Sequence, residues 1–252
     1  MLADFHNHSC LSPCGSLDMS PSVIAETAAA KKIKTLALTD HNSALNCRAF
    51  GFHCKRFGII PFYGLEVTTA EEVHMVTLFS NQEAAVEFGE YIYSIIVPFK
   101  NNPEKTGDQV YVDEEDDIIG EVEFYLVNAA EIGVDSLYAK ASQYGGIVIP
   151  AHIDRPAFSM TSQFGVLSKG QWAAVECVRI PPLSKFGDKD SPLLDTYQYP
   201  LITGSDAHYI EHIGRRPFDL EINEEELLPN GIEKDADINA LKTALAKRKT
   251  GE

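Results

Sequence analysis

The chain has 252 residues, of which 44% are hydrophobic and 23% are charged, as in an ordinary globular protein. Its 21 lysines and arginines stand against 37 aspartates and glutamates, which gives a formal net charge of −16 at pH 7. A surface this negative repels nucleic-acid phosphates, so we expect no duplex DNA or RNA partner. A small phosphorylated substrate can still bind where a pocket is locally positive.

Three features favour a cytoplasmic protein that has no membrane partner. The first residues, MLADFHNHS, include Asp4 and no basic region followed by an apolar stretch, so we expect no signal peptide. The most apolar run, YIYSIIVPF at 91–99, is too short to span a bilayer. The 5 cysteines are odd in number and scattered, which favours a reducing compartment over a disulfide framework.

Segments typical of strands and helices alternate along the first hundred residues. We expect a first strand in LADFHNHS at 2–9. A helix follows, with Ser20 as its cap and Pro21 in its first turn. Further strands are predicted within 35–42, 58–67 and 71–80, and then a helix over 82–96.

The alternation continues after a polar interruption. The segment from about Lys100 to Glu123 is polar and acidic, and we expect a surface excursion or an active-site lid there. Beyond it we predict a helix over 135–144, strands within 146–152, 172–178, 201–208 and 217–222, and a C-terminal helix over 236–249. No repeat or low-complexity linker divides the chain, so we expect a single domain over 1–252.

The order of these elements predicts an α/β fold. Apolar strands that alternate with helices are typical of a parallel sheet covered on both faces. Six to eight such units in 252 residues fit one closed or partly closed β/α barrel. An open doubly wound sheet is the alternative, and periodicity does not separate the two.

Polar side chains gather at or near the C-terminal ends of the predicted strands. In parallel β/α folds these ends meet at one face, where active sites are built. His6 and His8 are two residues apart, so on a strand both point to the same side. The residues that we expect to converge are His6, His8, His41, Glu66, His152, Asp206 and His208. His74 can join Glu66 through a short turn.

Such a cluster would be unfavourable without cations. Buried carboxylates would need protons or partners, and charged imidazoles would repel one another. Imidazole nitrogen and carboxylate oxygen suit Zn, Mn and Fe, and eight or nine ligands exceed what one ion can use. The sequence therefore predicts two or three divalent ions, with Glu66 or Asp206 able to bridge a pair.

Four further residues receive a different interpretation. We expect Asp4 and Asp40 to orient neighbouring imidazoles, a frequent need in metal sites. A turn or cap carboxylate is the alternative for both. His53 and His212 lie in polar segments typical of loops or helix surfaces, so we expect both to be solvated.

Five ordered blocks, DFHNHS, LTDHN, GLEVTT with EEVH, PAH and GSDAH, carry a family resemblance. They resemble the PHP superfamily, the polymerase and histidinol phosphatase family of metal-dependent phosphoesterases, from Asp4 to His208. The resemblance implies a distorted (β/α)7 TIM-like barrel with mostly parallel strands. It also implies a two- or three-metal site at the strand ends.

The resemblance also implies a set of metal ligands. One ion would be held by His6, His8, Glu66 and Asp206, a second by His41 and His208, and a third by Glu66, His74 and His152. Family members commonly place a further His or Asp before a glycine in the loop after the first strand. Here that loop contains SPCG, which puts Cys14 in this position, with Asp18 as the alternative. A Cys14 thiolate would favour zinc.

The predicted reaction is hydrolysis of a small phosphomonoester by a metal-bridging hydroxide that attacks in line. Arg155 in HIDRP is expected to bind the phosphate, with an ion pair to a nearby acid as the alternative. Arg215 in IGRRP is the next candidate for phosphate binding, with a solvated surface position as its alternative. Asp206 or His208 is expected to pass a proton to the leaving oxygen.

Three other functions stay open at the level of sequence. Metal-dependent amidohydrolases use a similar barrel and HxH pair, but they often carry a metal-bridging lysine, and the five blocks contain no lysine. A non-catalytic PHP module would have lost ligands, whereas nearly all positions are filled here. A 3′-to-5′ exonuclease on short oligonucleotides is also possible, although the acidic composition favours small substrates.

Overall fold

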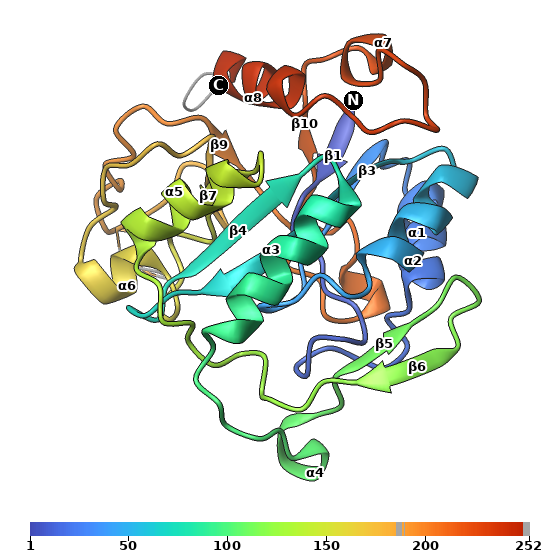
Figure 1. Cartoon of the computed structure of the whole chain (residues 1–252). Helices are drawn as coiled ribbons and strands as arrows, with labels where there is room; N and C mark the ends of the chain where they lie inside the picture. Colours follow the sequence, from blue (N-terminus) through green and yellow to red (C-terminus); the bar gives the residue numbers. More distant parts are fainter. Residues whose placement is uncertain (185–187, 189, 249–252) are drawn as a thin grey trace.

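The computed structural model describes residues 1–184, 188 and 190–248, and it is a mixed α/β fold with a curled central sheet (Figure 1). This sheet has six strands in the order β10-β1-β2-β3-β4-β7. Their bounds are Leu2–Asp4 (β1), Thr35–Leu38 (β2), Ile60–Thr68 (β3), His74–Phe79 (β4), Ile147–Pro150 (β7) and Phe218–Asp219 (β10). Two smaller sheets pair β5 (Val110–Val112) with β6 (Ile118–Glu121), and β8 (Val175–Glu176) with β9 (Leu201–Ile202).

The strand directions do not confirm the prediction of mostly parallel strands. Strands β1, β2 and β3 are parallel neighbours, but β10 is antiparallel to β1, and β4 is antiparallel to both β3 and β7. Only residues 69–73 join β3 to β4. A parallel return needs a crossover of a dozen or more residues, so this turn makes the pair antiparallel.

Backbone hydrogen bonds extend the curl of the sheet beyond β7. Ala173 N donates to Val148 O, which ties the segment before β8 to β7. Beyond β9, Ala207 forms a parallel bridge with Asn7, which follows β1. The sheet therefore curves from β7 back toward β1, and the complete (β/α)7 barrel stays a prediction.

The predicted helix after Ser20 is confirmed, because this side chain caps helix α1 and Pro21 begins it. The longer helices are α1 (Pro21–Ala30), α2 (Cys47–Arg56), α3 (Gln82–Ser94), α5 (Val134–Gln143) and α8 (Ile238–Lys247). The shorter ones are α4 (Pro103–Thr106), α6 (Met160–Phe164), η1 (Ile210–His212) and α7 (Glu224–Leu227). No helix within the described ranges is long and apolar enough to cross a membrane. The predicted end of the last helix, Lys249, lies outside the described residues.

Alternation along β3 decides which face carries the polar cluster. Tyr63 and Leu65 pack into the apolar cluster that contains residues of α1, α2 and α3. Ile60 and Phe62 pack on the opposite face, with residues of β4, β7 and α8. Because strand side chains alternate, Glu66 shares the face of Ile60 and Phe62. Its carboxylate therefore points to the inside of the curl.

The predicted excursion at 100–123 contains α4 and the β5–β6 hairpin, at the lower right of Figure 1. Strand β5 packs against the loop after β1 and against α2, through the small apolar cluster of Cys10, Ala49, Val110 and Val112. Whether this segment is a surface excursion or an active-site lid stays a prediction.

Candidate metal centre

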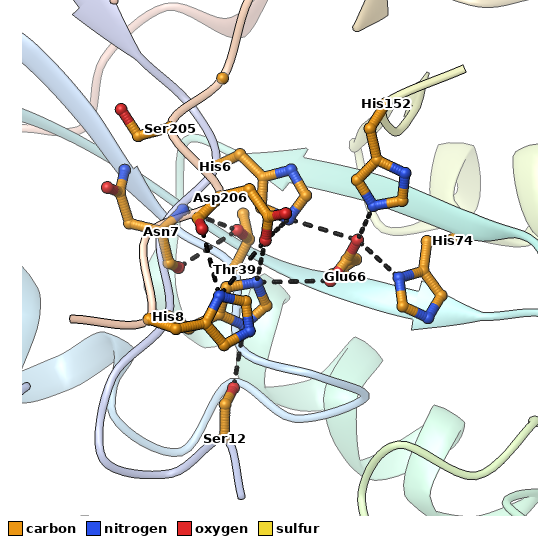
Figure 2. A network of polar contacts seen from close by, with 12 residues as sticks. His6, Asn7, His8, Ser12, Thr39, Glu66, His74, His152, Ser205 and Asp206 are labelled. Atoms are coloured by element: carbon orange, nitrogen blue, oxygen red, sulfur yellow. Dashed lines mark hydrogen bonds and ion pairs between the residues drawn. The ribbon is translucent and has the colours of Figure 1, made fainter. Parts of the chain in front are cut away.

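Glu66 is the centre of the convergent cluster (Figure 2). It is 1% exposed, and its Oε1 lies 2.8 Å from His74 Nδ1 and 2.9 Å from His152 Nε2. Its Oε2 lies 3.1 Å from His41 Nδ1 and 3.3 Å from His8 Nε2. Four imidazoles from four segments of the chain therefore meet at one buried carboxylate.

Asp206 is the second carboxylate of the cluster. Its Oδ1 lies 3.7 Å from His6 Nε2 and 3.5 Å from His8 Nε2. The same oxygen lies 3.4 Å from His208 Nδ1. Because His6 Nε2 is also 3.3 Å from Glu66 Oε1, the two imidazoles of the first strand end lie between two carboxylates.

Strand topology explains how these residues meet. His41 forms a parallel bridge with Glu66, next to the pairing of β2 with β3. His74 begins β4, and the antiparallel pairing of β4 with β3 places this start beside the end of β3. His152 and Asp206 have φ angles of 30° and 47°, a region that L-residues rarely adopt and that recurs at functional sites.

Three groups of ligand atoms lie within 4.8 Å of one another, which is close enough for shared ions. They are His6, His8, Glu66 and Asp206; His8, His41 and His208; and His41, Glu66 and His74. The first matches the set that the family resemblance implies for one ion. The second contains the implied pair of His41 and His208. The third has His41 in the place expected for His152, although His152 contacts the same carboxylate.

Unpartnered polar atoms test whether this cluster fits a metal. Of the ten buried side-chain nitrogens and oxygens that lack a hydrogen bond in the described parts of the chain, six belong to the cluster. Such atoms are rare and costly in folded proteins. Neighbouring ligand atoms around a tetrahedral ion with bonds of about 2.1 Å lie about 3.4 Å apart. The separations of 3.3 to 3.7 Å between His6 or His8 and the two carboxylates fit this value.

The electrostatics of the cluster favour a positive charge inside it. Burial alone would raise the pKa of Glu66, but the neighbouring imidazoles, His74 most strongly, hold this pKa well below its ordinary value. Burial alone would lower the pKa of His6, but the nearby carboxylates, Glu176 most strongly, raise this pKa well above its ordinary value. A divalent ion supplies the positive charge that both residues favour.

Two imidazoles of the cluster, His41 and His208, stay neutral, which is the form that binds metals. Burial holds the pKa of His41 well below its ordinary value. Burial, together with the neighbouring His8, lowers the pKa of His208 to about 3. Both imidazoles therefore have a free lone pair at neutral pH.

Glu176 is a residue of the site that the sequence analysis missed. It is 2% exposed, and His6 Nδ1 lies 2.9 Å from its Oε2 and 3.1 Å from its Oε1. A carboxylate in this position accepts the Nδ1 proton and leaves Nε2 of His6 free to bind a metal. The available signal was that Glu176 is an acid inside an otherwise apolar predicted strand.

The two aspartates expected to orient imidazoles differ from each other. Asp4 accepts hydrogen bonds from Ser205 N (2.9 Å) and Gly214 N (3.2 Å), so it holds two distant backbone segments and is neither an imidazole partner nor a local turn or cap carboxylate. Asp40 acts on an imidazole indirectly. It accepts a hydrogen bond from Ser12 Oγ (2.7 Å), and this oxygen lies 3.0 Å from His8 Nδ1.

The two predicted phosphate-binding arginines already have partners. Arg155 Nη1 donates to Asp206 Oδ2 at 2.6 Å, which is the alternative expected for it, and its side chain is 39% exposed. Arg215 Nε donates to Ser205 O at 2.6 Å, and its Nη2 donates to Asp206 O at 3.1 Å. Arg215 thus holds the backbone that presents Asp206.

The remaining predicted residues lie outside the cluster. Cys14 and Asp18 are exposed, and neither joins any of the three groups found among the described residues. The expectation that His53 is solvated was wrong. His53 is buried, with its Nε2 3.8 Å from Asp116 Oδ1, because the β5–β6 hairpin folds over α2. His212 is half-buried in η1.

A model of the PHP domain family matches residues 4–144. No curated protein matches the chain. The lesion-specific endonuclease PfuEndoQ from Pyrococcus furiosus has a similar fold, with a TM-score of 0.59, 18% identity, and coverage of 88% of this chain and 52% of that one. A structure of Endonuclease Q with a 27-mer duplex has a TM-score of 0.60 and 16% identity, and the match covers 97% of this chain and 56% of that one. The chain therefore spans about half the length of these endonucleases.

Two further solved structures match over nearly their whole length. A protein from Bifidobacterium adolescentis, named as a candidate metal-dependent phosphoesterase, has a TM-score of 0.53, 15% identity, and coverage of 98% of this chain and 96% of its own. An amidohydrolase from Chromobacterium violaceum, solved with sulfate, has a TM-score of 0.53 and 17% identity, and the match covers 86% of this chain and 91% of its own. At these identities the likeness is one of fold.

Proposed function

The chain therefore belongs to the PHP domain family, and we propose that it hydrolyses a small phosphomonoester with the help of two or three divalent ions. The observation that supports this most is the cluster around Glu66 and Asp206. Two buried carboxylates lie among six imidazoles there, and six of the cluster's polar atoms lack a hydrogen-bond partner. The single domain over 1–252 is part of this proposal.

The first ligand set is one of the three groups of atoms, and the other two are those that the family resemblance implies. One ion would be held by His6, His8, Glu66 and Asp206, a second by His41 and His208, and a third by Glu66, His74 and His152, with His41 near the third set as well. Zn, Mn and Fe suit these donors, and Cys14 as an additional ligand would favour zinc. Ions bound there lower the pKa of a coordinated water toward 7 and polarise the phosphoryl oxygens.

Arg155 is the side chain that we assign to the substrate phosphate. Its Nη1 holds Asp206 Oδ2, while its Nε and Nη2 make no hydrogen bond to any described residue. A guanidinium with free donors can bind two phosphoryl oxygens at once. Arg155 would thus position the phosphate and orient Asp206 together, and Arg215 supports the backbone behind them.

His208 is placed to contact the leaving group. Its side chain is 19% exposed, whereas the other five imidazoles of the cluster are 0% to 7% exposed. The leaving oxygen departs toward solvent, so His208 is the imidazole that it meets first. We assign the relay of a proton from water to this oxygen to His208, with Asp206 as the alternative, because burial keeps the His208 imidazole neutral and leaves it no extra proton of its own to give.

Metal analysis and a substrate panel test the proposal. We expect at least two ions per chain with Mn, Zn or Fe added. We also expect faster hydrolysis of phosphomonoesters, followed as released phosphate, than of phosphodiesters, followed as released alcohol. An amide substrate is the control for the amidohydrolase alternative. A wild-type chain that takes up no ion would overturn the proposal.

Two variants test the ligands directly. We predict that His41→Ala and Asp206→Ala each abolish phosphate release, because each removes a group that faces the shared ions. Circular dichroism should show that both variants remain folded. Unchanged turnover in either variant would count against the assigned site.

A nuclease is the second candidate function. Endonuclease Q, which has a similar fold, was solved with a duplex, whereas the net charge of −16 favours small substrates for this chain. The diester arm of the panel, extended to short oligonucleotides, separates the two candidates.

A further inference from the structure

Asn46 lies at the N-cap position of α2 but does not cap this helix. Asparagine is favoured there because its side-chain oxygen accepts an amide of the first turn, yet Asn46 makes no such hydrogen bond. Instead, Asn46 Oδ1 accepts from Val112 N in β5 at 2.9 Å. Its Nδ2 donates to Val110 O at 3.4 Å and to Ser9 Oγ at 2.9 Å. This buried amide therefore joins the hairpin to the loop after β1.

Further hydrogen bonds lead from Ser9 to the metal centre. Ser9 Oγ donates to Asp40 Oδ2 at 2.6 Å, and Ser12 Oγ donates to Asp40 Oδ1 at 2.7 Å. A hydroxyl has one proton, so Ser12 Oγ must accept at its contact with His8 Nδ1 (3.0 Å; Figure 2). His8 Nδ1 then carries a proton, which leaves Nε2, the atom that faces Glu66 and Asp206, as the one that would bind a metal ion.

We propose that Asn46 is a positioning residue that makes the β5–β6 hairpin part of the metal centre. The hydrogen-bond chain consists of Asn46, Ser9, Asp40, Ser12 and His8, and every member is buried. A hairpin that lifts away breaks the bonds of Asn46 and removes the constraint on the His8 ring. Metal affinity thus depends on the packing of the hairpin. This inference rests on the proposed metal-dependent function.

Gln109 supplies a matched control inside the same excursion. Its Nε2 donates to Val122 O at 3.1 Å and to Phe124 O at 2.9 Å, and its Oε1 accepts from Leu126 N at 2.8 Å. Like Asn46, it is buried and its amide bonds to backbone on both sides, with three hydrogen bonds against the four of Asn46, whose fourth goes to Cys10 Sγ at 3.6 Å. Unlike Asn46, it contacts no member of the hydrogen-bond chain.

Two measurements on the full chain test the proposal. The affinity for Zn²⁺ or Mn²⁺ is measured by competition with a chelating dye, and hydrogen exchange is followed by mass spectrometry over 9–16 and 107–124. In Asn46→Leu we expect about tenfold or more weaker metal binding and faster exchange in both segments. In Gln109→Leu we expect faster exchange in 107–124 with metal affinity close to that of the wild type.

Ser9→Ala removes the hydroxyl that joins Asn46 to Asp40, while the amide of residue 9 still donates to Asp40 Oδ1 and the bonds of Asn46 to β5 are preserved. We expect weaker metal binding with unchanged exchange in 107–124, and this variant also serves if Asn46→Leu fails to fold. Wild-type metal affinity in Ser9→Ala, or in a folded Asn46→Leu, would overturn the inference. A wild-type chain without metal affinity would instead overturn the proposed function, so the two failures are distinguishable.

Discussion

Asp4 shows how a buried carboxylate near the site acts on the backbone. It links the segment after β9, through Ser205 N, to the segment before β10, through Gly214 N. Burial raises the pKa of Asp4 to about 6, against the lowering effect of the Ser205 hydrogen bonds. The folded protein therefore binds the Asp4 proton more tightly than the unfolded chain does.

We predict that the stability contributed by Asp4 falls as the pH rises. Between the ordinary pKa of 3.8 and about 6, the folded state keeps a proton that the unfolded state has lost. From pH 4.5 to pH 7 this difference lowers the free energy of unfolding by about 2 kcal/mol relative to Asp4→Asn, which has no such proton. Denaturant titrations of the metal-free wild type and of metal-free Asp4→Asn at pH 4.5 and pH 7 measure this change in the free energy of unfolding. The same pH dependence in both proteins would contradict the prediction.

At the scale of elements, the residues that lead into the hairpin lie close against the loop after β1. Gly107 has a φ of 96°, and a Cβ at this position would lie 1.9 Å from Pro13 O. Gly145, between α5 and β7, has a φ of 77° with no atom within 4 Å of such a Cβ. Gly145 therefore reports backbone strain alone, whereas Gly107 combines a steric clash with a backbone conformation (ψ 164°) that essentially only glycine adopts.

We predict that Gly107→Ala destabilises the protein more than Gly145→Ala does. The left-handed backbone alone costs about 1–2 kcal/mol for a residue with a Cβ, and Gly145→Ala should lose about this much. Gly107→Ala must also displace the hairpin base from Pro13, so its loss should be larger by at least about 1 kcal/mol. The free energies of unfolding of the two variants test this prediction. Equal losses of stability in the two variants would show that the hairpin base adjusts without cost.

The elements that the sequence predicts well are those with local signals. Ser20 and Pro21 mark the start of α1, and the turn chemistry there needs no distant contact. Helix α2 was not predicted because CRAFGFHCKR has Gly51 in its middle and a polar C-terminal half. Phe50 and Cys54 hold this helix by packing into the core, a tertiary effect that overrides propensity.

The part of the candidate site that could be predicted is the set of residues that lie at strand ends. Imidazoles and carboxylates at the ends of neighbouring strands must meet, whatever the details of packing, and Glu66 with His41 illustrates this. Which individual side chains pair within the site could not be predicted from strand ends. Glu176 with His6, and Arg155 with Asp206, join segments 170 and 51 residues apart through side-chain geometry alone.

At the scale of the whole molecule, the overall charge opposes the local charge of the proposed site. The chain has a net charge of −16, yet the guanidinium groups of Arg155 and Arg215 lie beside Asp206 at the cluster. A phosphate dianion would approach against a repulsive field and meet positive charge only at short range. Salt screens the long-range repulsion more than the close contacts, because the Debye length shortens from about 30 Å at 10 mM to about 8 Å at 150 mM.

We therefore predict that kcat/KM for a small phosphomonoester rises as NaCl increases from about 10 to about 150 mM, at constant metal concentration. A phosphate diester carries one charge fewer, so any turnover of it should respond less and serves as the matched control. Duplex DNA should not bind at the lower salt concentration, where electrostatic attraction would be strongest. A kcat/KM that falls with salt would mean that the field at the site attracts polyanions despite the net charge. In that case the duplex bound by the structurally similar Endonuclease Q would become the better guide to the substrate.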